Sequence, residues 1–112
     1  MTARLFLVQR LTALILAPLV LVHLGVIVYA VRNGLSAAEI LDRTQGSLGW
    51  AAFYGLFVLT VPIHGAIGLR TILIEWGGQD QRTATRVAWS AGLLLLVLGL
   101  RAVWAVTAGG GA

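Results

Sequence analysis

The sequence contains no cysteine at all. This absence excludes disulfides, thiolate metal sites, an iron–sulfur cluster carried by this chain and the covalent attachment of a c-type haem, because each needs a cysteine sulfur. Lysine is absent too, so all eight basic residues are arginine. No glycine-rich strand-to-helix turn occurs either, and the chain therefore carries no recognisable flavin or nucleotide site.

Charge is scarce as well. Charged residues make up 11% of the 112 residues and hydrophobic residues 59%, and the mean hydropathy is +0.93. These values are far from those of an average soluble domain. There is also no basic stripe with interleaved aromatic residues, the pattern of a nucleic-acid interface. The composition thus predicts an integral membrane protein and excludes nucleic acid as a partner.

Long apolar segments predict an all-α membrane protein with three transmembrane helices, at about 11–31, 48–72 and 87–106, in one domain that covers residues 1–112. The first segment would span about 31 Å, the thickness of a bilayer core. Residues 1–10 form a short leader that we expect to stay in the protein, because the apolar run behind it is too long for a signal peptide. In the polar first loop, residues 32–47, Ser36 and Glu39 resemble the capping box of a short surface helix.

The arginines predict the orientation. Arginine is enriched on the cytoplasmic side of membrane proteins. An N-terminus in the cytoplasm would place five arginines on that side and three on the other: Arg4, Arg10, Arg70, Arg82 and Arg86 against Arg32, Arg43 and Arg101. We therefore expect the N-terminus inside and the C-terminus outside.

His64 is the first candidate functional residue, because an ionisable side chain at membrane depth is rare. On a helix, His64 shares one face with Gly68, Thr71 and Glu75. Gly68, one turn away, leaves room beside the imidazole. Two interpretations stay open at this point: a flat cofactor lies in that room, or another helix packs there while His64 hydrogen-bonds a neighbour.

His23 lies at a different depth. It would be roughly 20 Å beyond Arg10, whereas His64 would be only about 9 Å from Arg70, which marks the same side of the membrane. Thr12 shares the helical face of His23. Three helices enclose little, and a face of histidine and small residues needs a cover. This implies a hetero- or homo-oligomer, of which we expect a hetero-oligomeric helix bundle, with any cofactors at two separate heights.

The chain resembles the membrane-anchor (cytochrome b) subunits of succinate dehydrogenase and fumarate reductase. The resemblance is carried by Arg10-Leu11-Thr12-Ala13 with His23 behind it, and by His64-Gly65-Ala66-Ile67-Gly68-Leu69-Arg70 followed by Glu75-Trp76. It covers about residues 5–106. It implies three transmembrane helices with the N-terminus inside, in the inner (cytoplasmic) membrane of a bacterium.

By this resemblance, His64 is an axial ligand of a haem b, and Arg70 either neutralises a haem propionate or only marks the membrane edge. His23 resembles the first-helix histidines of two-haem members of the broader family, so one or two haems are expected, shared with a partner subunit. A haem iron takes a neutral imidazole nitrogen whose ring partner is oriented by an acceptor. The alternatives are a haem-free anchor, and a His23 that is only hydrogen-bonded in the bundle.

The resemblance also implies a quinone site from Arg10, Thr12, Glu75 and Trp76. A quinone under reduction needs hydrogen-bond donors and a proton route, which an indole and a carboxyl can offer. This sequence departs from the family at three positions. Trp76 is a departure because the usual aromatic donor, in one of the family's subunits, is tyrosine, and Gln9 and Phe6 stand where one anchor type has histidine and serine. The partner subunit is then expected to supply the hydroxyl donors.

The sequence therefore predicts a non-catalytic subunit of succinate:quinone oxidoreductase. It would dock a flavoprotein subunit and an iron–sulfur subunit to the membrane lipid, beside what we expect to be a second anchor subunit, for electron transfer between succinate and quinone. The alternative is a haem-free structural anchor or a small three-helix transport accessory. Colour separates them, since only a haem subunit co-purifies as a red complex.

Overall fold

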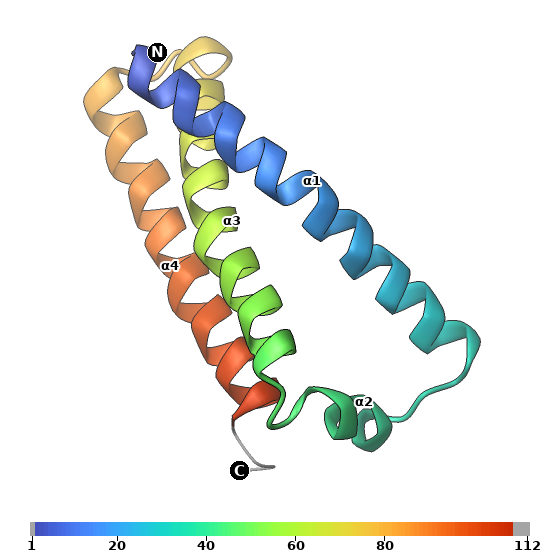
Figure 1. The fold of residues 1–112 in the computed structure, drawn as a ribbon. Coiled ribbons are helices and arrows are strands. Elements are labelled where there is room, and N and C mark those ends of the chain that lie inside the picture. Colours follow the sequence, from blue (N-terminus) through green and yellow to red (C-terminus); the bar gives the residue numbers. More distant parts are fainter. Residues whose placement is uncertain (1, 109–112) are drawn as a thin grey trace.

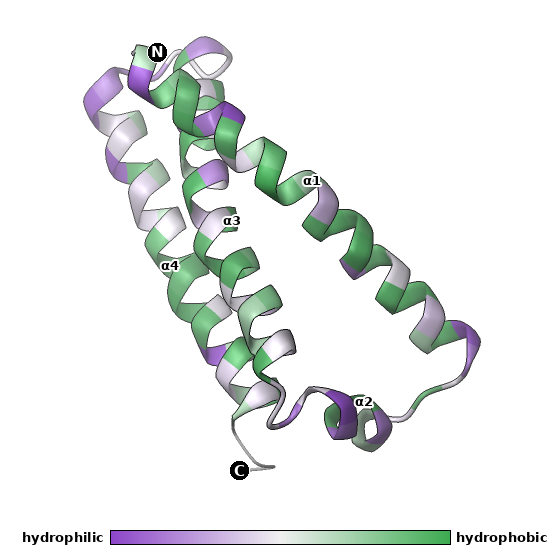
Figure 2. Ribbon diagram, in the orientation of Figure 1, coloured by the Kyte–Doolittle hydropathy of each residue, from purple (hydrophilic) through white to green (hydrophobic). Residues whose placement is uncertain are grey.

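The computed structural model describes residues 2–108, and this part of the chain is helical without any strand. Its elements are α1 (Ala3–Arg32), α2 (Ala37–Thr44), α3 (Leu48–Glu75) and α4 (Gln81–Thr107) (Figure 1). The three long helices are apolar and long enough to cross a membrane. Hydrophilic residues gather at the helix ends and in α2 (Figure 2). The predicted all-α, three-span architecture is confirmed.

A polar side chain caps the start of each long helix. Thr2, Ser47 and Asp80 each accept a hydrogen bond from the backbone N–H three residues later, which satisfies a donor without a partner inside the helix. As a result α1 already begins at Ala3, and the expected leader is its first turns. Similarly, α4 begins at Gln81 and not at the start of the apolar run.

The capping box in the first loop is present. Ser36 accepts from the backbone of Glu39, and the Glu39 carboxylate accepts from the backbone N–H of Ser36 at 3.2 Å. At the other end of α2, the hydroxyl of Thr44 donates to the carbonyl of Val106 at 2.6 Å. This bond ties α2 to the end of α4.

Helices α3 and α4 run side by side (Figure 1) and meet along small residues of α4. Ala84, Ala88 and Gly92, one per turn, are buried. A Cβ atom on Gly92 would lie 3.1 Å from Cβ of Ala66 and 3.2 Å from the carbonyl oxygen of Pro62. Small residues permit such close approach of helix backbones in membranes. This seam holds α3 around Pro62, two residues before His64.

Helix α1 packs most closely on α3 through its first half. Its buried residues, Thr12 and Leu16, both lie there. Further along, α1 diverges from α3, and α2 lies across the open end of the gap (Figure 1). Large apolar side chains of α1, such as Leu14 at 71% and Leu21 at 70% exposed, face away from the protein. These surfaces suit lipid or further helices.

Candidate functional site

His64 meets α1 where the two helices cross. Its Nδ1 lies 3.1 Å from the hydroxyl oxygen of Thr12. Thr12 is buried, and His64 is half-buried. The contact joins residues 52 positions apart in the chain, so it fixes the rotation of α1 against α3 as well as the orientation of the imidazole.

The second nitrogen of His64 is available. Only Gln9 Oε1 and His23 Nδ1 are buried side-chain polar atoms without a hydrogen-bond partner in residues 2–108. Nε2 of His64 makes no hydrogen bond within the same residues and is not one of these two buried atoms. It therefore keeps some accessible surface. The same part of the chain holds no group of three His, Cys, Asp or Glu side chains able to bind a metal ion. His64 thus has one ring nitrogen, Nε2, without a hydrogen-bond partner in these residues, while Nδ1 is hydrogen-bonded to Thr12.

The surface beside Gly68 is covered by Gln9 of α1. A Cβ atom on Gly68 would lie 3.3 Å from Gln9 Nε2, and Gln9 Oε1 is buried without a hydrogen-bond partner. Within this chain, then, the missing side chain of Gly68 accommodates a residue of the neighbouring helix. Of the two interpretations of this face, the geometry within one chain supports helix packing.

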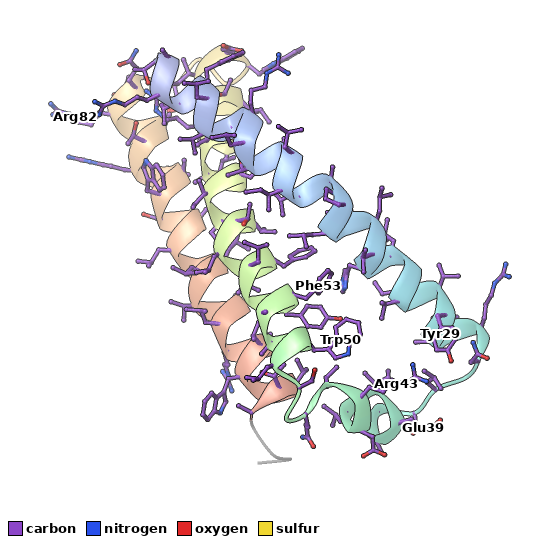
Figure 3. The ribbon with its side chains drawn as sticks, in the orientation of Figure 1. Tyr29, Glu39, Arg43, Trp50, Phe53 and Arg82 are labelled. Atoms are coloured by element: carbon purple, nitrogen blue, oxygen red, sulfur yellow. The ribbon has the colours of Figure 1, made fainter. Side chains whose placement is uncertain are left out.

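His23 lies between α1 and α3, further toward α2 than His64, and packs against aromatic rings. The edges of Tyr54 and Phe57 meet its ring at centroid distances of 5.9 and 5.4 Å. Trp50 and Phe53 extend the cluster, with Trp50 stacked on Tyr54. In Figure 3, Trp50 and Phe53 project from α3 into this gap. The positions 50, 53, 54 and 57 follow the spacing of one helical face, a signal that could have revealed this cluster from the sequence.

Two apolar cavities border His23. One, of about 420 Å³, lies between α1, α2 and the start of α3, and the other, of about 350 Å³, extends from α3 to the end of α4. Both are lined by His23, Tyr54, Ile40 and Thr44. The Nδ1 atom of His23 is buried without a partner. Such a polar atom in an apolar surrounding is costly unless something binds it.

The two histidines lie at different heights along α3. His23 contacts Phe57, and His64 is two turns further on, or about 10 Å along the axis. Thr12 and His23 project from the same face of α1, and both meet α3. The two histidines therefore lie about two helical turns apart along α3.

The remaining predicted site residues gather at the opposite end from α2. The start of α1 and the turn between α3 and α4 lie close together there (Figure 1). Arg70 Nε donates to the hydroxyl of Thr85 at 3.0 Å, in a shallow hollow that Arg82 and Arg86 also line. The guanidinium of Arg10 lies 5.1 Å above the ring of Phe6.

Glu75 and Trp76 end α3 at the same side. Both are exposed, Trp76 by 86%. Arg10, Glu75 and Trp76 thus lie toward one end of the bundle. Thr12, two residues after Arg10 in α1, has its hydroxyl hydrogen-bonded to His64 and to its own helix.

Comparison with known proteins places these observations in a family. The model for the succinate dehydrogenase/fumarate reductase transmembrane subunit matches residues 1–106. No curated protein and no solved structure matches the chain. Because the family model covers nearly the whole sequence, including both histidines and all three long helices, the chain belongs to the family of succinate dehydrogenase/fumarate reductase transmembrane subunits.

Proposed function

We propose that this chain is a haem b-binding anchor subunit of a succinate:quinone oxidoreductase, in the cytoplasmic membrane of a bacterium. It docks the flavoprotein and iron–sulfur subunits, pairs with a second anchor subunit and contributes to the quinone site. The observation that carries the proposal is His64, with Nδ1 bonded to Thr12 and Nε2 accessible and unpartnered.

These residues fit a haem. A macrocycle supplies four of the iron's ligands, so the protein has only to present single axial nitrogens. An imidazole with one nitrogen anchored by an acceptor and the other free is the usual form of a histidine ligand. When bound, the haem supplies one-electron transfer within the membrane, and Arg70 offers the terminal nitrogens of its guanidinium to a carboxylate.

His23 is proposed as the ligand of a second haem. Support comes from the two apolar cavities beside it, which give an otherwise aromatic pocket unfilled space. Its separation from His64 along α3 favours two haems over one haem held by both.

The quinone site is proposed at the cytoplasmic end, from Arg10, Glu75 and Trp76. The indole N–H of Trp76 donates a hydrogen bond, and Glu75 relays protons from the aqueous side. Both are exposed on this chain alone, so the docked subunits would complete the pocket.

The test is a dithionite-reduced minus oxidised spectrum of the purified complex, with haem quantified per flavin. We expect b-type bands in the wild type, loss of one haem in His64→Ala, and loss of a different one in His23→Ala. Each histidine variant is the matched control of the other, because both remove an imidazole at membrane depth. Unchanged haem in His64→Ala refutes the assignment, and a haem-free wild type identifies a plain structural anchor. If His64→Ala loses haem while His23→Ala retains its full haem content, His23 is a packing residue.

A further inference from the structure

The hydroxyl of Thr12 is surrounded by three polar atoms. Its oxygen lies 2.8 Å from the carbonyl of Val8, 3.0 Å from the carbonyl of Gln9 and 3.1 Å from Nδ1 of His64. Both carbonyls belong to its own helix, and the imidazole belongs to α3. A threonine hydroxyl has one proton to donate and two lone pairs to accept with.

The two carbonyls decide where that proton points. A carbonyl oxygen can only accept, and oxygen–oxygen separations of 2.8 and 3.0 Å are hydrogen-bond distances. If the proton of Thr12 pointed at His64, its lone pairs would face two carbonyl oxygens with no proton between them. The proton therefore lies toward Val8 and Gln9, and the lone pairs of Thr12 are left for His64.

We propose that Thr12 is a positioning residue that holds His64 as the Nδ1–H tautomer, by accepting a hydrogen bond from Nδ1. The imidazole proton then sits on the buried side of the ring, and the lone pair sits on the accessible Nε2. This inference rests on the proposed function, in which Nε2 binds the haem iron. It moves Thr12 from the quinone site to the haem ligand.

Burial makes the bond hard to replace. Thr12 is only 7% exposed, so little water reaches Nδ1 when the hydroxyl is removed. A buried donor that loses its acceptor bears the cost of its desolvation. Without the hydroxyl, the other tautomer and other ring orientations compete with the one that binds iron.

The same hydrogen bond should lower the midpoint potential of the haem iron. An acceptor on the far nitrogen raises the basicity of a histidine ligand, and a more basic ligand stabilises ferric over ferrous iron. Loss of the Thr12 hydroxyl should therefore raise the midpoint potential of the haem at His64. A residue that only fills space would not change the potential in this way.

The experiment compares variants in the assembled complex. Thr12→Val keeps the shape and removes the hydroxyl, whereas Thr12→Ser keeps the hydroxyl. Thr60→Val is the matched control, because Thr60 is similarly buried and donates to its own helix, to Leu56 at 2.7 Å, but makes no hydrogen bond to a histidine. The readouts are the midpoint potential, the g-values of the ferric low-spin signal and the retention of haem.

In Thr12→Val we expect a raised potential, shifted g-values and haem retention weakened roughly tenfold or more. Thr12→Ser and Thr60→Val should resemble the wild type. The inference is overturned if Thr12→Val has wild-type potential and g-values, or if Thr12→Ser behaves like Thr12→Val. If Thr12→Val loses its haem entirely, the haem content of Thr12→Ser is the test. Retained haem in Thr12→Ser supports the role of the hydroxyl, and lost haem in Thr12→Ser overturns it.

The His64→Ala variant distinguishes failure of the proposed haem ligand from failure of the inference about Thr12. If it keeps its full haem content, the proposed ligand is wrong and the role of Thr12 is wrong with it. If His64→Ala loses a haem while Thr12→Val is unchanged in potential and signal, the ligand stands and only the inference about Thr12 is refuted.

Discussion

Replacement of Gly92 by alanine should weaken the packing of α4 on α3 beside His64. The new methyl group would lie 3.1 Å from Cβ of Ala66 and 3.2 Å from the carbonyl oxygen of Pro62. Ordinary carbon contacts are at about 3.5–4.0 Å. Neither neighbouring atom is the end of a flexible side chain, so the strain is relieved only if the helices separate by a few tenths of an ångström.

The magnitude follows from two opposing effects. Overpacking of a close interface costs about 1–3 kcal/mol, whereas alanine gains up to about 1 kcal/mol over glycine in a helix. Gly55→Ala in α3 is the control, since no atom outside the local backbone lies within 4 Å of its added Cβ. The helix-propensity gain is common to both variants. Their difference in unfolding free energy therefore reports the packing cost, about 1–3 kcal/mol.

The assay is denaturant-induced unfolding in mild detergent micelles, followed by circular dichroism and by the flavin-normalised yield of the complex. Ala66→Gly in the Gly92→Ala background removes the shorter of the two contacts and leaves the one to Pro62, so a partial recovery is expected. Equal stability of Gly92→Ala and Gly55→Ala would show that the seam is not closely packed and would refute the reasoning.

Two further predictions concern the helix ends. Thr44→Val should destabilise the protein by about 1 kcal/mol in the same unfolding assay, because the carbonyl of Val106 loses its donor; Thr44→Ser should not. The hydrogen bonds from Thr83 lower the pKa of Asp80 below the usual carboxyl range. Its stabilisation of α4 is therefore present at neutral pH and lost as the pH falls through that lowered pKa. Hydrogen exchange at the start of α4 should accelerate on acidification in the wild type but show no such step in Asp80→Asn, which caps without ionising.

The sequence was sufficient for the architecture because membrane insertion imposes simple rules. Long apolar runs must be helices when no water satisfies their backbone, and Ser36 with Glu39 gives a local signal that needs no tertiary information. The helix starts were missed since capping by Thr2 and Asp80 extends the helices beyond the apolar segments. The small-residue repeat at 84, 88 and 92 was visible at a spacing of four and indicates the α4 seam.

The partner of His64 could not be derived from spacing. Helical periodicity correctly predicts that Thr12 and His23 share a face of α1, but it does not say which residues of α3 that face meets. The register between two helices depends on side-chain packing along their whole contact. Here α1 is buried against the bundle at Thr12 and Leu16 and then diverges. As a result Thr12 reaches His64, and His23, further along α1, reaches the aromatic cluster of α3.

Because α1 diverges from α3 along its length, the surroundings of the two histidines differ. At His64, α1 already occupies the Nδ1 side of the ring through Thr12. No side chain of residues 2–108 makes a hydrogen bond to Nε2, and if a haem is held there as proposed, we expect another subunit to supply the iron's other protein ligand. At His23 this chain provides aromatic walls and apolar space. Removal of the second anchor subunit should therefore abolish the haem signal at His64, whereas the aromatic pocket around His23, which α1, α2 and α3 build together, should keep its shape.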